Sequence, residues 1–430
     1  MVSRLLGIVA VASLVVASLL VPAPGTSEPG GELPVPRPAE VAVCPITVDR
    51  SSGGSVILSS AVPGTARSVV YAAGRRISEG DVVIDPTGGV RVGFDQLVVS
   101  GLAGLLMELP DGDVATGITV TGQGLAAANC TAPSSATTMA AGVSTRSGER
   151  VGLMLVNPYA VDAVVSVSSS SEAGVDSAGE LETVIVPAGS VVTRDLDALL
   201  PLRNRLSVAI TSNSGQVHGF LFQQGGTDRA LVEAVTPQAS WQVPLAPAVE
   251  GVGEVIVVAS SSSVDIPVRV DGLVDGRWVD GLWSTTIAAR SQVEFSLADL
   301  DPRPTALRIG ADGLIVPSLV IESDTVRAVS PAVPFASTDW YISATGEGQL
   351  EAIVASSGEF DASVTFFPHV NGGRPIIVDI PPGGSVAVQL PAVEAGYAVR
   401  ATSEVLVMWR SSLEGGLALG AAVPVEGLGE

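Results

Sequence analysis

The chain has 430 residues, more than one hydrophobic core usually organises, so several domains are expected. Apolar residues make up 47% of the chain and charged residues only 15%, a balance that excludes disorder along most of its length. Acidic residues outnumber basic ones by 44 to 22, and the resulting net charge of -22 excludes a nucleic-acid-binding function.

An export signal is predicted at the amino terminus, over residues 1–22. Residues 5–21 form an unbroken run of apolar and small residues that follows Arg4. At about 1.5 Å per residue this run gives roughly 25 Å of helix, short for a membrane span but long for a cleaved signal. Because proline follows Ala23, where cleavage would occur, we favour an uncleaved signal anchor over a removed signal peptide.

The expected topology is a single membrane pass, with Arg4 inside and the bulk of the chain extracytoplasmic. The membrane is therefore an expected partner, through the N-terminal helix. Secretion after signal cleavage is the alternative. Residues 23–43 are rich in Pro, Gly and acid, and they predict an extended linker that holds the following domains away from the bilayer.

From residue 44 onward the chain repeats itself about every hundred residues. Each repeat opens with a short strand and continues with a second apolar strand that ends in a small polar residue. These second strands are Val56–Ser60, Leu153–Asn157, Ile256–Ser260 and Ala352–Ser356. The repeats are predicted at 44–134, 135–238, 239–338 and 339–430.

Turn signals divide each repeat into about seven short strands, and no long helical period occurs. Three repeats carry a signal that predicts a hairpin, at Asp111-Gly112, Asn213–Gly215 and Asp312-Gly313. The predicted fold is all-β, with four tandem immunoglobulin-like or jelly-roll-like β-sandwich repeats after an N-terminal hydrophobic helix. A β-propeller is the alternative, although its blades recur at roughly 40 to 50 residues and no such half-period occurs.

The only two cysteines, Cys44 and Cys130, fall near the two ends of the first predicted repeat. Because an exported chain meets an oxidising compartment, we expect a disulfide between them, closing a loop of 86 positions (130 − 44). Chain-entropy arguments assign such a loop roughly 4 to 5 kcal/mol of stabilisation. Two buried free thiols are the alternative.

The sequence predicts no catalytic residue, no metal and no cofactor. Its histidines, His218 and His369, fall in different predicted repeats, and neither has a nearby Cys or His that would make it a zinc ligand. All basic residues are arginine, which excludes Schiff-base chemistry and a lysine-containing phosphate loop. Asp-Gly pairs in the third repeat lack the ligand spacing of a calcium loop and predict turns.

The strongest candidate for a binding segment runs from Arg277 to Trp283, where two aromatic residues flank an acid. Sugar-binding sites commonly combine an aromatic platform with carboxylate hydrogen bonds, so Trp278, Asp280 and Trp283 are candidate glycan-binding residues. Core packing is the competing interpretation, because Trp278 and Trp283 differ in parity and would face opposite ways on a regular strand.

One stretch of the chain resembles a known family. Cys130–Pro133, Gly142 and Gly152–Pro158 resemble the family's Cys-x-x-Pro, Gly-containing strand and Leu-x-Leu-x-Asn-Pro. Where the family usually has Trp between them, this chain has Thr138 and Met139. The family is the exported actinobacterial domain-of-unknown-function family 5719. The resemblance implies an envelope location and a link to cell-wall glycan assembly, and it defines no catalytic residues.

The sequence is therefore compatible with three functions. The first is a non-enzymatic extracytoplasmic envelope protein, a structural or interaction scaffold with an envelope protein or cell-wall polysaccharide as partner. The second is a polysaccharide-binding module. The third, an enzyme of unfamiliar type, would need carboxylates that converge in a pocket between repeats, and we do not expect it.

Overall fold

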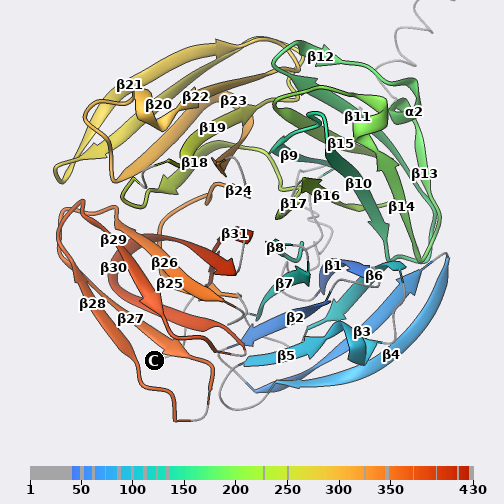
Figure 1. The fold of residues 1–430 in the computed structure, drawn as a ribbon, viewed down its shortest axis with the longest axis horizontal. Coiled ribbons are helices and arrows are strands. Elements are labelled where there is room, and N and C mark those ends of the chain that lie inside the picture. Colours follow the sequence, from blue (N-terminus) through green and yellow to red (C-terminus); the bar gives the residue numbers. More distant parts are fainter. Residues whose placement is uncertain are drawn as a thin grey trace, which may run out of the picture. The chain divides into compact units, whose positions relative to one another are not determined.

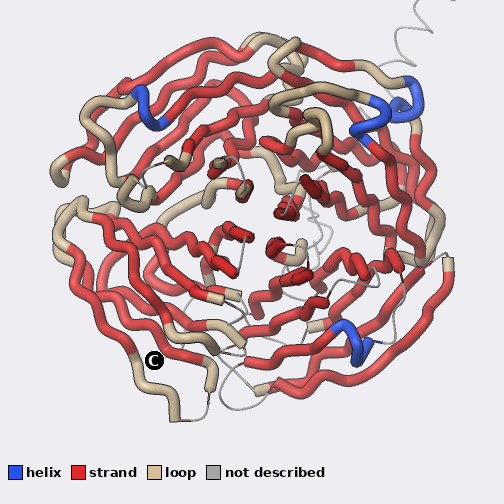
Figure 2. Tube along the Cα trace, viewed as in Figure 1, coloured by secondary structure: helices blue, strands red, loops and turns tan. Residues whose placement is uncertain are grey.

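Strands make up nearly all of the regular structure in a computed structural model of the chain, and helices are confined to short pieces (Figure 2). The structure describes residues 41–48, 53–60, 63–72, 74–84, 89–97, 101–109, 114–122, 124–131, 136–225, 228–248, 251–323, 326–343, 348–370, 372–393, 395–413 and 416–425. All of them belong to one compact unit, Pro38–Glu430. The all-β prediction is confirmed.

The first segment of the chain, 41–131, forms two four-stranded antiparallel sheets (Figure 1). A short 3-10 helix, η1 (Phe94–Leu97), precedes β6. The strand order of one sheet is β1 (Val41–Val48), β6 (Gly101–Glu108), β3 (Gly64–Ala72), β4 (Arg75–Ile84). That of the other is β5 (Gly89–Gly93), β2 (Gly53–Ser60), β7 (Val114–Gly122), β8 (Gly124–Asn129).

The second segment, 137–235, likewise forms two sheets. One has the order β14 (Ser190–Asp195), β10 (Glu149–Asn157), β16 (His218–Gly225), β17 (Asp228–Glu233). The other has the order β12 (Gly174–Asp176), β11 (Ala163–Ser171), β15 (Leu206–Ser214), β9 (Thr137–Val143), with β13 (Val184–Val186) beside β11. Two single-turn helices, α2 (Gly179–Glu182) and α3 (Leu196–Leu199), lie between these strands in sequence.

The third segment, 238–333, is a seven-stranded sheet, and the fourth, 337–425, an eight-stranded one. The third contains β18 (Gln238–Pro244), β19 (Gly253–Ala259), β20 (Ile266–Val274), β21 (Arg277–Ile287), β22 (Gln292–Ser296), η2 (Leu297–Asp299), β23 (Ala306–Glu322) and β24 (Arg327–Pro331). The fourth contains β25 (Ser337–Ile342), β26 (Gln349–Ser356), β27 (Ala362–Pro368), β28 (Ile376–Ile380), β29 (Ser385–Leu390), β30 (Tyr397–Leu413), β31 (Gly416–Ala421) and β32 (Val423–Pro424).

In each of these last two segments, one long strand pairs with different partners along its two halves: β23 in the third segment and β30 in the fourth. The first half of β23 pairs with β18 and β20, and its second half pairs with β19 and β24. The Asp312-Gly313 signal lies inside this 17-residue strand, and Asn213–Gly215 separates β15 from β16, which belong to different sheets. The hairpin prediction was therefore wrong at both places, because turn chemistry also serves a chain that bends from one sheet to another. Asp111-Gly112 lies outside the described residues.

The opening strand of each segment pairs with the residues that end the same segment. Val43 is bridged to Thr131, Met139 to Val235 and Gln242 to Val333, and Tyr341 pairs with Val423 in the same way. Every ladder between described strands likewise stays within one segment. Each of the four segments is therefore hydrogen-bonded as a unit, and the strand β1 already begins at Val41, inside the predicted linker.

Packing, in contrast, crosses from segment to segment. One hydrophobic cluster runs from Leu125 in the first segment through the second and third segments to Ala422 in the fourth. A second cluster joins most of the first segment to Met154 and Phe220 of the second. The four segments therefore share hydrophobic clusters and do not each have a separate core.

The predicted N-terminal helix lies outside the described residues. None of the helices in the described part of the chain has both the length and the apolar character that a membrane crossing requires. The alternative fold, a β-propeller, is not found among the described strands.

Candidate functional site: the strand junction and the adjoining cleft

Four strands, one from each segment, meet at the middle of the view in Figure 1. They are β8, β17, β24 and β31, the last strands before each segment returns to its opening strand. β8 contacts β17 and β31, and β24 contacts the same two, so the contacts close into a ring. We call this set of strands the junction.

Asp228, the first residue of β17, lies at one end of the junction. Its Oδ1 accepts hydrogen bonds from the backbone N–H of Arg229 (2.8 Å), Leu417 (3.4 Å) and Leu125 (3.5 Å). Its Oδ2 accepts from the backbone N–H of Arg327 at 2.9 Å and also from that of Leu417 at 3.3 Å, so the Leu417 N–H is shared between the two oxygens. One carboxylate thereby binds a main-chain donor from every one of the four segments.

These four N–H groups occupy equivalent places in their strands. Leu125, Arg229, Arg327 and Leu417 each stand the same number of residues before the residue that pairs with the opening strand. Each strand would otherwise begin with an unpaired buried donor, which is costly. Asp228 satisfies all four, and its residue is only 4% exposed.

The strands approach so closely here that a side chain is excluded at one of them. A Cβ built on Gly416 would lie 2.5 Å from the backbone N of Leu125, closer than packed atoms come. Glycine at this position in β31 therefore allows the N–H of the next residue, Leu417, to reach Asp228. Gly124 takes the equivalent place in β8.

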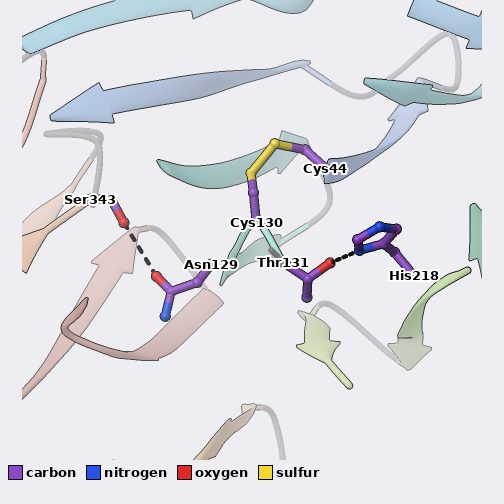
Figure 3. Close-up of a disulfide and its surroundings, with 6 residues drawn as sticks. All are labelled: Cys44, Asn129, Cys130, Thr131, His218 and Ser343. Carbon is purple, nitrogen blue, oxygen red and sulfur yellow. Dashed lines mark hydrogen bonds between the residues drawn. A yellow bond between two sulfur atoms is a disulfide. The ribbon is translucent and has the colours of Figure 1, made fainter. Parts of the chain in front are cut away.

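The other end of the junction holds a second buried carboxyl, Glu233. Asn129 Nδ2 donates to Glu233 Oε1 at 3.4 Å and to the carbonyl oxygen of Ala421 at 2.9 Å. Asn129 Oδ1 in turn accepts from the Ser343 hydroxyl at 3.3 Å (Figure 3). Asn129 thereby links the first segment to the second and the fourth.

Burial shifts the pKa values of both carboxyl groups upward. It raises the pKa of Asp228 to about 6, although the four backbone hydrogen bonds act in the opposite direction. It raises the pKa of Glu233 to about 7, against the opposing effect of hydrogen bonds including that from Asn129. The two ends of β17 thus carry carboxyl groups that titrate nearer to neutrality than usual.

The predicted disulfide between Cys44 and Cys130 is confirmed, with the two Cα atoms 4.6 Å apart (Figure 3). It ties the opening strand β1 to the residue that follows β8. Val43 and Thr131, beside the two cysteines, exchange backbone hydrogen bonds of 2.8 and 2.9 Å. The bridge therefore reinforces the joint between opening and closing strands.

Next to the disulfide, His218 is held by two hydroxyl groups. Thr131 Oγ1 lies 2.8 Å from His218 Nδ1, and the Tyr159 hydroxyl lies 3.0 Å from Nε2. Burial lowers the pKa of His218 to about 3 and raises that of Tyr159. Each ring nitrogen has a hydroxyl partner, and the neutral ring joins the first segment to the second.

A cleft of about 900 Å³ opens at the Asp228 end of the junction, between the second and third segments. Asp228 belongs to its lining, and a second, more apolar hollow of about 580 Å³ adjoins it. We call the larger of the two hollows the cleft. Its charged and polar lining side chains are Arg146, Ser147, Glu149, Gln223, Asp228, Arg229, Glu322, Ser323 and Arg327.

An ion-pair network joins the two walls of the cleft. Arg205 of the second segment pairs with Glu322 of the third, and Arg327 of the third pairs with both Glu322 and Glu149 of the second. Burial alone would raise the pKa of Glu322, but the hydrogen bonds and charges of Arg205 and Arg327 outweigh it and hold the pKa at about 2. Glu322 is therefore ionised at neutral pH.

The candidate glycan-binding residues lie elsewhere, on the edge strand β21. Trp283 packs on Phe295 with ring centroids 4.5 Å apart, whereas the Trp278 ring lies beneath the Arg308 guanidinium, 4.2 Å from its centroid. Asp280 is largely exposed and pairs with Arg269 Nη2 at 3.0 Å. The two tryptophans have separate neighbours and do not form a shared platform.

Sequence reasoning missed Asp228, Glu233 and the cleft. The one signal that existed was positional: when the closing strands are aligned, Asp228 stands where two other segments have Gly124 and Gly416. A charged side chain at a position that is glycine in two other segments indicates a special role for that side chain. Its partners, backbone N–H groups up to 189 residues away, leave no side-chain pattern. Within the described ranges, no group of three or more His, Cys, Asp or Glu side chains is placed to hold a metal ion.

Comparison with protein families gives one match. Residues 108–391, more than half of the chain, match the model described as a family of unknown function, DUF5719. The chain belongs to this family. The DUF5719 assignment confirms the resemblance found in the sequence, and the matched region includes the closing strands β8, β17 and β24. No curated protein matches the chain.

Two solved structures show distant similarity to the chain. A Streptomyces avermitilis α-L-rhamnosidase complexed with L-rhamnose is 8% identical with a TM-score of 0.15, and the match covers 71% of this chain and 44% of the rhamnosidase. Two B repeat units of the collagen-binding protein of Staphylococcus aureus are 9% identical with a TM-score of 0.12, and that match covers 84% of this chain and 94% of theirs. This DUF5719 chain therefore spans less than half of the rhamnosidase, and TM-scores this low do not establish a shared fold.

Proposed function

We propose that this protein is a non-enzymatic, extracytoplasmic envelope scaffold built from four sandwich-like β units. The units are those expected from the sequence, 44–134, 135–238, 239–338 and 339–430, after an N-terminal anchor. The observation that carries the proposal is the junction. Its buried carboxyl groups, Asp228 and Glu233, and the nearby His218 of β16 are all engaged in hydrogen bonds that join segments to one another.

Such use of buried polar groups favours a scaffold over a catalyst. A catalytic carboxyl needs access to a substrate, whereas Glu233 is buried and Asp228 is occupied by four backbone donors. The disulfide supports an oxidising, extracytoplasmic location. The closed ring of contacts favours a compact body with a fixed surface over an extended spacer.

The test is recovery of partners from intact envelopes. A tagged full-length chain is crosslinked in cells that produce it and purified from the membrane fraction. We expect defined envelope proteins or wall polysaccharide to co-purify, and mass spectrometry of the amino terminus to find residues 1–22 retained. Recovery of the tagged chain from the cytosolic fraction, or turnover of an envelope substrate by the purified chain, would contradict the proposal.

Polysaccharide binding is the second candidate, and the cleft is the observation that favours it. Guanidinium, carboxylate, amide and hydroxyl groups line one hollow of a size usual for ligand sites. Trp278, Asp280 and Trp283 remain candidates for the same function. The Arg308 guanidinium over Trp278 weakens their case, because it takes up a ring face on which a sugar would stack.

A further inference from the structure

The cleft has the side chains of a binding site. Asp228, Arg229 and Gln223 line it although each of these residues is less than 5% exposed, so its floor is built from buried polar groups and not from freely solvated ones. Arg327, with 11% of its side chain exposed, also contributes. Buried polar groups that converge on one hollow are the usual mark of a ligand site.

The charges of the lining restrict the class of ligand. The lining contains three arginines, Arg146, Arg229 and Arg327, and three acids, Glu149, Asp228 and Glu322. An anionic ligand would meet the carboxylates and a cationic ligand would meet the guanidinium groups, and in both cases like charges repel. A ligand without net charge avoids this repulsion.

Sugar hydroxyl groups suit such a lining best. Each hydroxyl both donates and accepts, so it can donate to a carboxylate while it accepts from a neighbouring guanidinium group. The cleft volume of about 900 Å³ lies near the upper end of the range for small-ligand sites, and the adjoining hollow lengthens it. A short stretch of a glycan chain fits both the chemistry and the size.

We propose that the cleft between the second and third segments binds a neutral oligosaccharide, or the neutral part of a wall polysaccharide, through its guanidinium and carboxylate groups. This inference rests on the second candidate function and moves its site from β21 to the cleft. The scaffold role does not depend on it.

Two glycines provide matched variants that separate the two locations. Gly253 lines the cleft, and a Cβ there would meet only ordinary contacts, the nearest being the Glu322 carbonyl oxygen at 3.5 Å. Gly310 lines the shallow groove of β20, β21 and β23, beside Arg308, and a Cβ there would meet nothing within 4 Å. Neither glycine has a positive φ, so the backbone at both positions accepts a residue with a side chain.

The experiment is saturation-transfer NMR and titration calorimetry on the full chain with neutral trisaccharides, namely maltotriose, cellotriose, galactotriose and arabinotriose. We expect at least one to bind the wild type, Gly253→Leu to weaken it at least ten-fold, and Gly310→Leu to leave affinity within two-fold. Thermal melting of each variant verifies folding.

Three outcomes would overturn the proposal: no binding to the wild type, loss of binding in Gly310→Leu with retention in Gly253→Leu, or equal binding by all three proteins. The second of these places the site in the groove of β20, β21 and β23. Charged probes, a galacturonic acid trimer and a glucosamine trimer, are expected to bind at least ten-fold more weakly than the best neutral probe, and equal binding by either would also contradict the assignment. Envelope crosslinking tests the scaffold role separately.

Discussion

At the scale of single residues, Asp228 has the largest predicted effect. Asp228→Ala leaves four N–H groups without an acceptor, two in buried residues and two in half-buried ones, and we expect it to lower the free energy of unfolding by about 3 to 5 kcal/mol. Asp228→Asn keeps one acceptor oxygen and should cost less, about 2 kcal/mol. Urea denaturation measures both, with the exposed Asp361→Asn as the matched control. Equal stability of Asp228→Ala and the control would refute the role assigned to Asp228.

His218 makes the free energy of unfolding depend on pH. Its pKa is about 3 in the folded protein but about 6.5 when unfolded, so between these values only the unfolded state takes up the proton. Stability from this group is complete above pH 6.5 and is lost as the pH falls toward 3. From pH 6.5 to 5 the loss is on the order of 2 kcal/mol.

Comparison of variants isolates this histidine. The difference in unfolding free energy between the wild type and His218→Gln should shrink by about that amount between pH 6.5 and pH 5. Val83→Ala, at an exposed position of β4 that does not titrate, serves as the control. A difference that stays constant with pH would show that folding does not lower the pKa of His218.

Glu233 changes the free energy of unfolding with pH in the direction opposite to His218. Burial raises its folded pKa to about 7, above its ordinary value, so the folded state holds the proton more tightly than the unfolded state. The stability it contributes is complete below about pH 4.5 and is lost as the pH rises through 7. Urea denaturation of Glu233→Gln should therefore show a gain over the wild type that grows from pH 5 to pH 7.5, and a gain independent of pH would contradict the shift.

At the scale of elements, the disulfide joins β1 to the end of β8 across a loop of 86 residues. Its removal in Cys44→Ala/Cys130→Ala should lower stability by roughly 4 to 5 kcal/mol. Thermal melting with and without reductant tests this: the wild type should lose stability on reduction, while the double variant is indifferent to the reductant. A wild type unaffected by complete reduction would show that the backbone bridge between Val43 and Thr131 suffices.

Local apolar pattern was enough to place many of the strands. Val56–Ser60, Leu153–Asn157 and Ala352–Ser356 all fall within observed strands, β2, β10 and β26, because β-branched runs bounded by turn residues suit buried strands. The signals at Asn213–Gly215 and Asp312-Gly313 were misassigned. A turn residue reports the bend of the backbone but not the sheet that the chain enters next, which depends on distant strands.

At the scale of the whole molecule, the sequence predicted repeats of about a hundred residues but not how the segments of the chain meet. The junction depends on one side chain that accepts from the backbone of four segments, and backbone donors are the same for every residue type. Trp241 and Trp340, by contrast, stand at equivalent places in the opening strands β18 and β25. Both indole N–H groups donate to the carbonyl oxygen three residues earlier, those of Gln238 and Ser337.

Hydrogen–deuterium exchange tests most directly whether the hydrogen bonds of Asp228 join the four segments into one body. Peptides that contain β8, β17, β24 and β31 should be protected in the wild type. In Asp228→Ala all four should exchange faster together, although three of them belong to other segments. Faster exchange confined to β17, with β8, β24 and β31 unchanged, would contradict the account.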